Sequence, residues 1–150
     1  AALMIIAFGL LDSVDGALAR LQGRDSVKGM LLDASTDRMK EALIFMALAY
    51  RFAVDSEPWA VLAAAAAITG SMSVSYIKAK GETALKDSKL SGNEINRLFQ
   101  SGLMRYEVRM AVLVIGLFIG RVEVAVAIIA ILSWATAFYR LITISSKVDN

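Results

Sequence analysis

Long apolar stretches alternate with short polar ones along nearly the whole chain. A helix needs about 20 predominantly apolar residues to cross a bilayer. By that measure five segments are predicted to span a membrane, namely residues 1–20, 29–54, 58–80, 103–120 and 122–145. The pattern therefore predicts an all-α fold, a polytopic transmembrane helical bundle that forms one domain over residues 1–150.

The connections between these segments differ in length. Residues 55–57 and the residues around Arg121 form short turns, and Pro58 suits the first position of a helix. Residues 81–102 form a longer polar connection, in which Asn93 is suited to cap a short helix at the membrane surface. A solvated loop is the other interpretation of that connection.

Two sequence features bear on helix contacts. Gly116 and Gly120 have the spacing that lets two transmembrane helices approach closely. We therefore predict a homodimer. Tyr76 and Trp134 are expected to lie at the membrane–water boundary, where amphipathic aromatic rings are frequent.

The first segment opens within an apolar run, AALMIIAFGLL, which is shorter than a full span. No charged residue precedes this run and no cleavage site follows it, so a signal peptide is not predicted. We expect the run to be the later part of a helix that begins before residue 1.

The composition agrees with a membrane protein. Hydrophobic residues make up 57% of the chain and the mean hydropathy is +0.60, both high for a soluble domain. Histidine and cysteine are absent, which excludes zinc sites built on them, thiol nucleophiles and Ser-His-Asp triads. The net charge of +2 gives no indication of nucleic-acid binding.

The basic residues are distributed unevenly between the two ends of the predicted spans. If successive spans alternate in direction, fourteen of the 16 lysines and arginines fall on one side, and only Arg51 and Arg121 fall on the other. Positively charged loops remain in the cytoplasm. We therefore expect a multi-pass integral membrane protein whose aspartate-rich end faces the cytoplasm.

Four aspartates stand out in this apolar sequence: Asp12, Asp15, Asp33 and Asp37. Their spacing puts each pair on one face of a helix, and the short link between the two helices makes these antiparallel neighbours. Carboxylates near a bilayer are costly unless they bind something, and hard oxygen ligands suit a divalent metal ion. The alternative is a solvated ion-pair network with the basic residues nearby, Arg20, Arg24, Arg38 and Lys40.

The aspartates belong to a longer pattern, D-x2-D-G-x2-A-R-x8-G-x3-D-x3-D, which residues 12–37 match without a gap. This pattern resembles the signature of the CDP-alcohol phosphatidyltransferases, a family with six transmembrane helices. The resemblance implies that the chain lacks an N-terminal amphipathic segment and the first transmembrane helix, so that five of six spans are present. It covers essentially the whole chain, although its specific part is residues 12–37.

The resemblance also implies a reaction. A hydroxyl group of a small polar alcohol attacks the lipid-linked phosphorus of a CDP-lipid, and CMP leaves. Two divalent ions, Mg²⁺ or Mn²⁺, are implied to bind the four aspartates Asp12, Asp15, Asp33 and Asp37, with Asp37 as the general base. The CDP group is implied to bind at Asp12, Gly16, Ala19, Arg20 and Gly29.

Other segments indicate the acceptor alcohol. LLDASTDR and SYIKAKGE resemble the corresponding stretches of family members that use an inositol phosphate. GLMRYEVR departs from the GLxxRPER run usual in that branch, and matches it at Gly102, Leu103 and Arg109. In that branch basic residues hold the phosphate of the acceptor, and here they correspond to Lys78, Lys80, Arg105 and Arg109. Ordinary flanking charge at the membrane surface is the alternative explanation of these four.

Other interpretations of the function remain open at this point. The acceptor is an inositol phosphate, glycerol 3-phosphate, or a neutral alcohol such as inositol or serine, or else the carboxylates mark a cation transporter. A transporter is expected to carry charges near mid-membrane in several helices, whereas residues 58–77 and 110–120 contain none. The expected partners are a CDP-lipid, a small alcohol and the membrane lipids.

Overall fold

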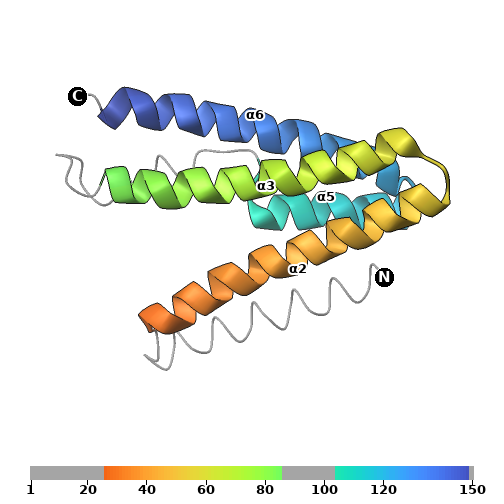
Figure 1. Ribbon diagram of the computed structural model, residues 1–150, viewed down its shortest axis with the longest axis horizontal. Coiled ribbons are helices and arrows are strands. Elements are labelled where there is room, and N and C mark those ends of the chain that lie inside the picture. The colour runs from red at the N-terminus through yellow and green to blue at the C-terminus, as the bar shows by residue number, and fades with distance from the viewer. Residues whose placement is uncertain (1–25, 86–103, 149–150) are drawn as a thin grey trace.

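A computed structural model describes residues 26–85 and 104–148, which form four α-helices. They are α2 (Val27–Val54), α3 (Pro58–Ala84), α5 (Tyr106–Ile119) and α6 (Val122–Val148). Figure 1 shows α3 and α6 running side by side, with α5 against them and α2 diverging from them towards its N-terminal end. The all-α prediction is confirmed for the described part of the chain. Asp12, Asp15, Gly16, Ala19 and Arg20, and the short helix expected after Asn93, lie outside it.

Local sequence signals account for the ends of these helices. The Ser26 hydroxyl accepts a hydrogen bond from the Gly29 backbone N–H at 2.9 Å, which caps the start of α2. Pro58 is the first residue of α3, as its fixed φ and missing N–H favour. Gly120 has a φ of 72°, in the left-handed region that favours glycine, and ends α5 immediately before α6. The predicted short turns are confirmed at both places.

The connection after α3 was predicted wrongly at its start. Residues 81–84 continue α3 by a turn, although they were expected to open a polar loop. Gly81 is buried, so this extra turn packs against the rest of the molecule despite its polar composition. The remainder of the predicted connection lies outside the described residues.

The core forms where α3 packs against α2 and α6. Small residues on α3 make this possible, because Ala60, Ala64 and Ala67 are all fully buried. At Gly70 a β-carbon would come within 3.0 Å of the Trp134 ring of α6. The Trp134 indole N–H donates to the Ala66 carbonyl oxygen at 3.1 Å. Trp134 therefore joins α6 to α3. Its position at the membrane–water boundary stays a prediction.

Gly116 and Gly120 both serve the connection between α5 and α6 of the same chain. A β-carbon on Gly116 would lie only 2.3 Å from that of Ala125, so glycine is required where α5 turns into α6. Gly120 supplies the left-handed residue of the same turn. The spacing thus needs no second copy of the chain to explain it, and the homodimer stays a prediction.

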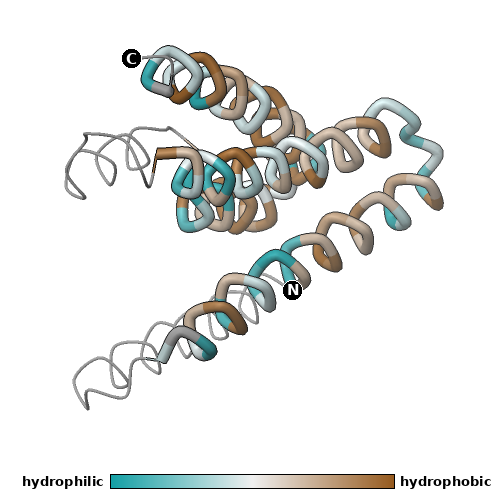
Figure 2. The backbone as a smooth tube through the Cα atoms, turned by 60° about the vertical axis from the view of Figure 1, so that its left-hand side comes forward, coloured by the Kyte–Doolittle hydropathy of each residue, from teal (hydrophilic) through white to brown (hydrophobic). Residues whose placement is uncertain are grey.

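Two of the described helices have the length and apolar composition to cross a membrane: α3, over Pro58–Ala84, and α6, over Val122–Lys147. α5 has 14 residues and so extends for about 21 Å, less than the bilayer core. α2 is long enough, but its first half carries charged residues. Figure 2 shows the hydrophilic turn between α2 and α3, flanked by helices that carry apolar residues. Within the described chain, the five predicted spans are thus supported in part.

Candidate active site

A cavity of about 560 Å³ is lined by residues of α2, α3, α5 and α6, together with Arg105 just before α5. Most of its lining side chains carry charge, four of them acidic and five basic: Asp33, Asp37, Glu82 and Glu107, and Arg38, Lys78, Arg105, Arg109 and Arg140. A cavity with both signs of charge in a mainly apolar chain is suited to a polar, charged ligand.

The two described aspartates of the sequence pattern both line this cavity. Gly29, Asp33 and Asp37 follow one another at intervals of four residues within α2, as predicted, so they share one face of the helix. Asp33 is exposed, whereas the side chain of Asp37 is only 19% exposed and lies 3.7 Å from the Lys40 ammonium group. Oxygen donors one turn apart at the wall of a cavity fit a hard divalent cation.

The described residues do not include a full cluster of metal ligands. Within residues 26–85 and 104–148, no group of three or more acidic, histidine or cysteine side chains is arranged to hold a metal ion. The predicted set draws two of its four carboxylates, Asp12 and Asp15, from outside that range. Asp33 and Asp37 are the half of the set that the structure describes.

The four basic residues predicted to bind the acceptor occupy different environments. Lys78 of α3 and Arg105 line the cavity, and Lys78 lies 3.8 Å from Glu82 in a half-exposed pair. Lys80 is exposed and is not among the lining residues. Arg109 also lines the cavity, but it is almost completely buried. The structure thus brings three of the four together with Asp33 and Asp37.

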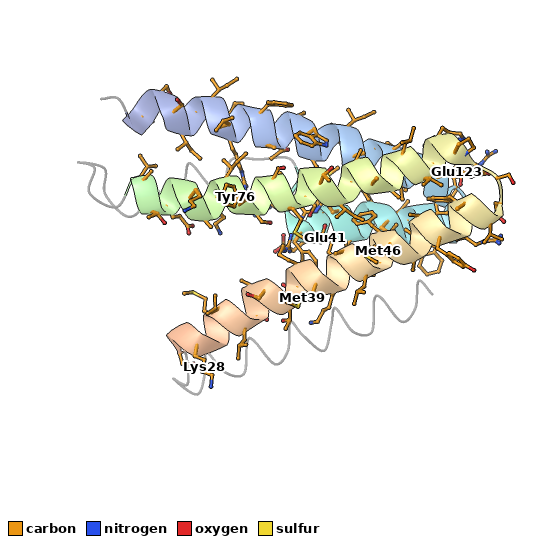
Figure 3. The ribbon with its side chains drawn as sticks, viewed as in Figure 1. Lys28, Met39, Glu41, Met46, Tyr76 and Glu123 are labelled. Atoms are coloured by element: carbon orange, nitrogen blue, oxygen red, sulfur yellow. The ribbon has the colours of Figure 1, made fainter. Side chains whose placement is uncertain are left out.

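Arg109 is held by a buried carboxylate, that of Glu41. Its Nε donates to Glu41 Oε1 at 2.5 Å and its Nη2 donates to Glu41 Oε2 at 3.0 Å. Its Nη1 donates to the Met104 carbonyl oxygen at 2.5 Å. Both side chains of the ion pair are 1% exposed. Figure 3 shows Glu41 on the side of α2 that lies near the start of α5, whereas the neighbouring Met39 is exposed.

Arg38 extends this cluster into the cavity. Its Nη1 donates to Glu41 Oε2 at 2.7 Å and is 3.3 Å from the Ser75 hydroxyl of α3. Its guanidinium carbon lies 4.8 Å from the centre of the Tyr106 ring, within cation–π range. Arg38, which lines the cavity, and the buried Glu41 therefore connect α2 to both α3 and α5.

Glu41, Tyr106 and Arg140 contribute to this cluster or to the cavity lining, although none of them was predicted as a site residue. Arg140 of α6 is buried, lines the cavity and donates to the Val74 carbonyl oxygen at 3.4 Å. Its burial could not be read from the sequence, where it counts simply as one of the basic residues on the cytoplasmic side. Glu41 left a usable signal, because it continues the interval of four from Asp33 and Asp37 into an apolar segment, where a carboxylate requires a partner.

The sequence is similar to those of proteins from one known enzyme family. Residues 1–143 match the sequence profile of CDP-alcohol phosphatidyltransferases. An archaetidylinositol phosphate synthase of Aeropyrum pernix is 34% identical over 98% of this chain and 71% of its own length. One of Pyrococcus horikoshii is 30% identical over 97% of this chain and 70% of its own length. A phosphatidylinositol phosphate synthase of Cutibacterium acnes is 38% identical over 58% of this chain, but over only 42% of its own length. The chain therefore belongs to the CDP-alcohol phosphatidyltransferase family, and it is an enzyme of phospholipid synthesis and not a cation transporter.

Proposed function

We propose that this protein transfers the phosphatidyl-type group of a CDP-linked lipid to a hydroxyl group of an inositol phosphate, with release of CMP. The observation that carries the proposal is the cavity in which the carboxylates of α2 lie together with cationic side chains of α3, α5 and α6. Relatives that are named inositol phosphate lipid synthases support the choice of acceptor.

The cationic lining is suited to a phosphorylated acceptor. A phosphate monoester carries close to two negative charges at neutral pH, and hydrogen bonds from cations to phosphate are stronger than neutral ones. Lys78 and Arg105 are the best placed of the predicted ligands, because both line the cavity. Arg140 is a further candidate from α6. Arg109 has hydrogen bonds from all three of its nitrogens, so its direct contact with the phosphate, like that of the exposed Lys80, stays a prediction.

The α2 carboxylates are proposed to act on the donor side of the reaction. Asp33 and Asp37, with Asp12 and Asp15, would hold two Mg²⁺ or Mn²⁺ ions. When bound, such ions neutralise the pyrophosphate of the CDP-lipid and stabilise charge at the reacting phosphorus. The CDP group itself is proposed to contact Gly16, Ala19, Arg20 and Gly29.

Asp37 is proposed to accept the proton of the attacking hydroxyl group. The hydroxyl oxygen forms a new bond to the lipid-linked phosphorus, the bond from that phosphorus to the CMP oxygen breaks, and the hydroxyl proton passes to the Asp37 carboxylate. The position of Asp37 at the wall of the cavity supports this role. The cavity is also proposed to face the cytoplasm in a multi-pass protein, since most lysines and arginines fall at that end of the predicted spans.

An acceptor screen tests the proposal. The protein in detergent micelles is given a CDP-lipid, Mg²⁺ and one of four alcohols, namely inositol 1-phosphate, glycerol 3-phosphate, inositol or serine, and CMP release is measured. We expect inositol phosphate to support release at least about tenfold faster than inositol, because the neutral alcohol leaves the cationic lining without its anion. Faster release with glycerol 3-phosphate would retain a phosphorylated acceptor but reject inositol phosphate. Faster release with inositol or serine would reject the cationic cavity as the acceptor site.

The positions of two lysines on α3 provide a matched pair of variants. Lys78 lines the cavity and Lys80 does not. Lys78→Gln should raise the KM for the acceptor about three- to tenfold, within the range of a partly exposed charge-assisted hydrogen bond, with the KM for the CDP-lipid nearly unchanged. Lys80→Gln should raise the acceptor's KM by a clearly smaller factor, because Lys80 is exposed and a contact that it makes with the phosphate is weakened by solvent. Equal effects of the two substitutions on the acceptor's KM would contradict the placement of the acceptor in this cavity.

A further inference from the structure

The buried carboxylate of Glu41 binds two arginines from two helices. Oε1 accepts from Arg109 of α5, and Oε2 accepts from both Arg109 and Arg38. The carboxylate has one negative charge and the two guanidinium groups have two positive charges. This group of three side chains therefore has an excess of positive charge, and both arginines line the cavity.

The geometry of Arg38 depends on Glu41. The Arg38 side chain is 20% exposed, whereas that of Glu41 is 1% exposed, so Glu41 anchors it from the interior. The bond to Ser75 and the stacking on Tyr106 then fix the direction of the guanidinium plane. Two guanidinium groups this close to one carboxylate repel each other, and the shared negative charge is what makes their common position favourable.

We propose that Glu41 is a positioning residue of the transfer reaction, which holds the guanidinium groups of Arg38 and Arg109 at the wall of the cavity so that their positive charge faces the acceptor phosphate. The inference rests on the proposed function and deepens it, since it assigns the orientation of the acceptor to a residue one helical turn beyond Asp37 on the same face of α2. Glu41 acts through the arginines and does not touch the substrate.

A purely structural role for Glu41 makes a different prediction. An ion pair that only joins α2 to α5 would, when weakened, lower thermal stability and reduce all kinetic parameters together. A positioning role instead affects the acceptor selectively. The KM for the acceptor should rise while the KM for the CDP-lipid, which is bound by the α2 carboxylates, stays within about twofold.

The test uses Glu41→Asp and Glu41→Gln. Aspartate keeps the charge but withdraws it by one methylene, so this variant should fold and should raise the acceptor's KM several-fold. Glutamine removes the charge and should raise that KM by about tenfold or more, the loss expected of a buried charge-assisted interaction. The matched control is Asp55→Asn, which removes a carboxylate from the exposed Arg51–Asp55 pair at the other end of α2, and should leave both KM values unchanged. Thermal unfolding midpoints are measured for all variants.

A double-mutant cycle tests whether Glu41 changes the acceptor's KM through Arg38. In an Arg38→Lys background, Glu41→Asp should raise the acceptor's KM by a smaller factor than in the wild type, because Glu41 then positions only the guanidinium group of Arg109. An acceptor KM of wild-type size in Glu41→Asp would overturn the inference, as would parallel loss of acceptor and donor binding. If Glu41→Gln does not fold, Glu41→Asp decides alone. The acceptor used is whichever alcohol the wild-type protein prefers, so a failure of the proposed inositol phosphate is seen in the wild type and is distinct from a failure at Glu41.

Discussion

Asp37→Asn is expected to lower kcat by about 10²–10⁴-fold, the usual contribution of a general base. Asparagine has nearly the same shape but cannot accept the proton of the attacking hydroxyl group. Asp37 lines the cavity and lies on the same face of α2 as Asp33, which supports the proposed role. The measurement is the steady-state rate of CMP release at saturating acceptor, CDP-lipid and Mg²⁺.

The comparison variant is Asp33→Asn, which changes a neighbouring carboxylate of the same cavity. It should weaken the binding of metal and CDP-lipid together, whereas Asp37→Asn should largely spare CDP-lipid binding. Asp55→Asn, at the exposed far end of α2, controls for the loss of a carboxylate in general. A kcat near that of the wild type in Asp37→Asn would remove the general-base assignment.

Removal of divalent metal is expected to abolish CMP release altogether. The donor's pyrophosphate carries negative charge, and the carboxylates proposed to surround it add more, so the reactants repel one another without a cation between them. Activity should disappear in excess EDTA and return when Mg²⁺ or Mn²⁺ is added beyond the chelator. Initial rates across a titration of free metal provide the measurement.

Two controls make the metal experiment specific. Thermal unfolding in EDTA checks that the protein remains folded, and a matched addition of Na⁺ checks that ionic strength alone does not restore the rate. Undiminished CMP release in excess chelator would contradict the assignment of a metal to the aspartates.

The helical architecture was predictable because its signals are local. Pro58 and Gly120 mark ends of helices through their own backbone preferences, so the predicted boundaries there agree with the structure. Residues 81–84 show the limit of that approach. Their polar side chains are typical of a loop, but in the structure they continue α3 and Gly81 is buried, and burial of that kind depends on the packed molecule.

The candidate site was predictable only where its residues repeat along one helix. Asp33 and Asp37 were found from their spacing, whereas the partnership of Glu41 with Arg109 joins residues that are 68 positions apart. Lys78 and Lys80 are equivalent by charge and position in the sequence, yet only Lys78 lines the cavity, since the two project from different faces of α3. Distinguishing such residues requires the positions of the neighbouring helices.

The most direct test of the account identifies the lipid product. The wild-type protein is incubated with a CDP-lipid, Mg²⁺ and inositol 1-phosphate, and the lipids are extracted and analysed by mass spectrometry. We expect a new lipid with two phosphorus atoms, one transferred from the donor and one brought by the acceptor, in equal amount to the CMP released. A product with a single phosphorus atom, or CMP release without a new inositol-containing lipid, would contradict it.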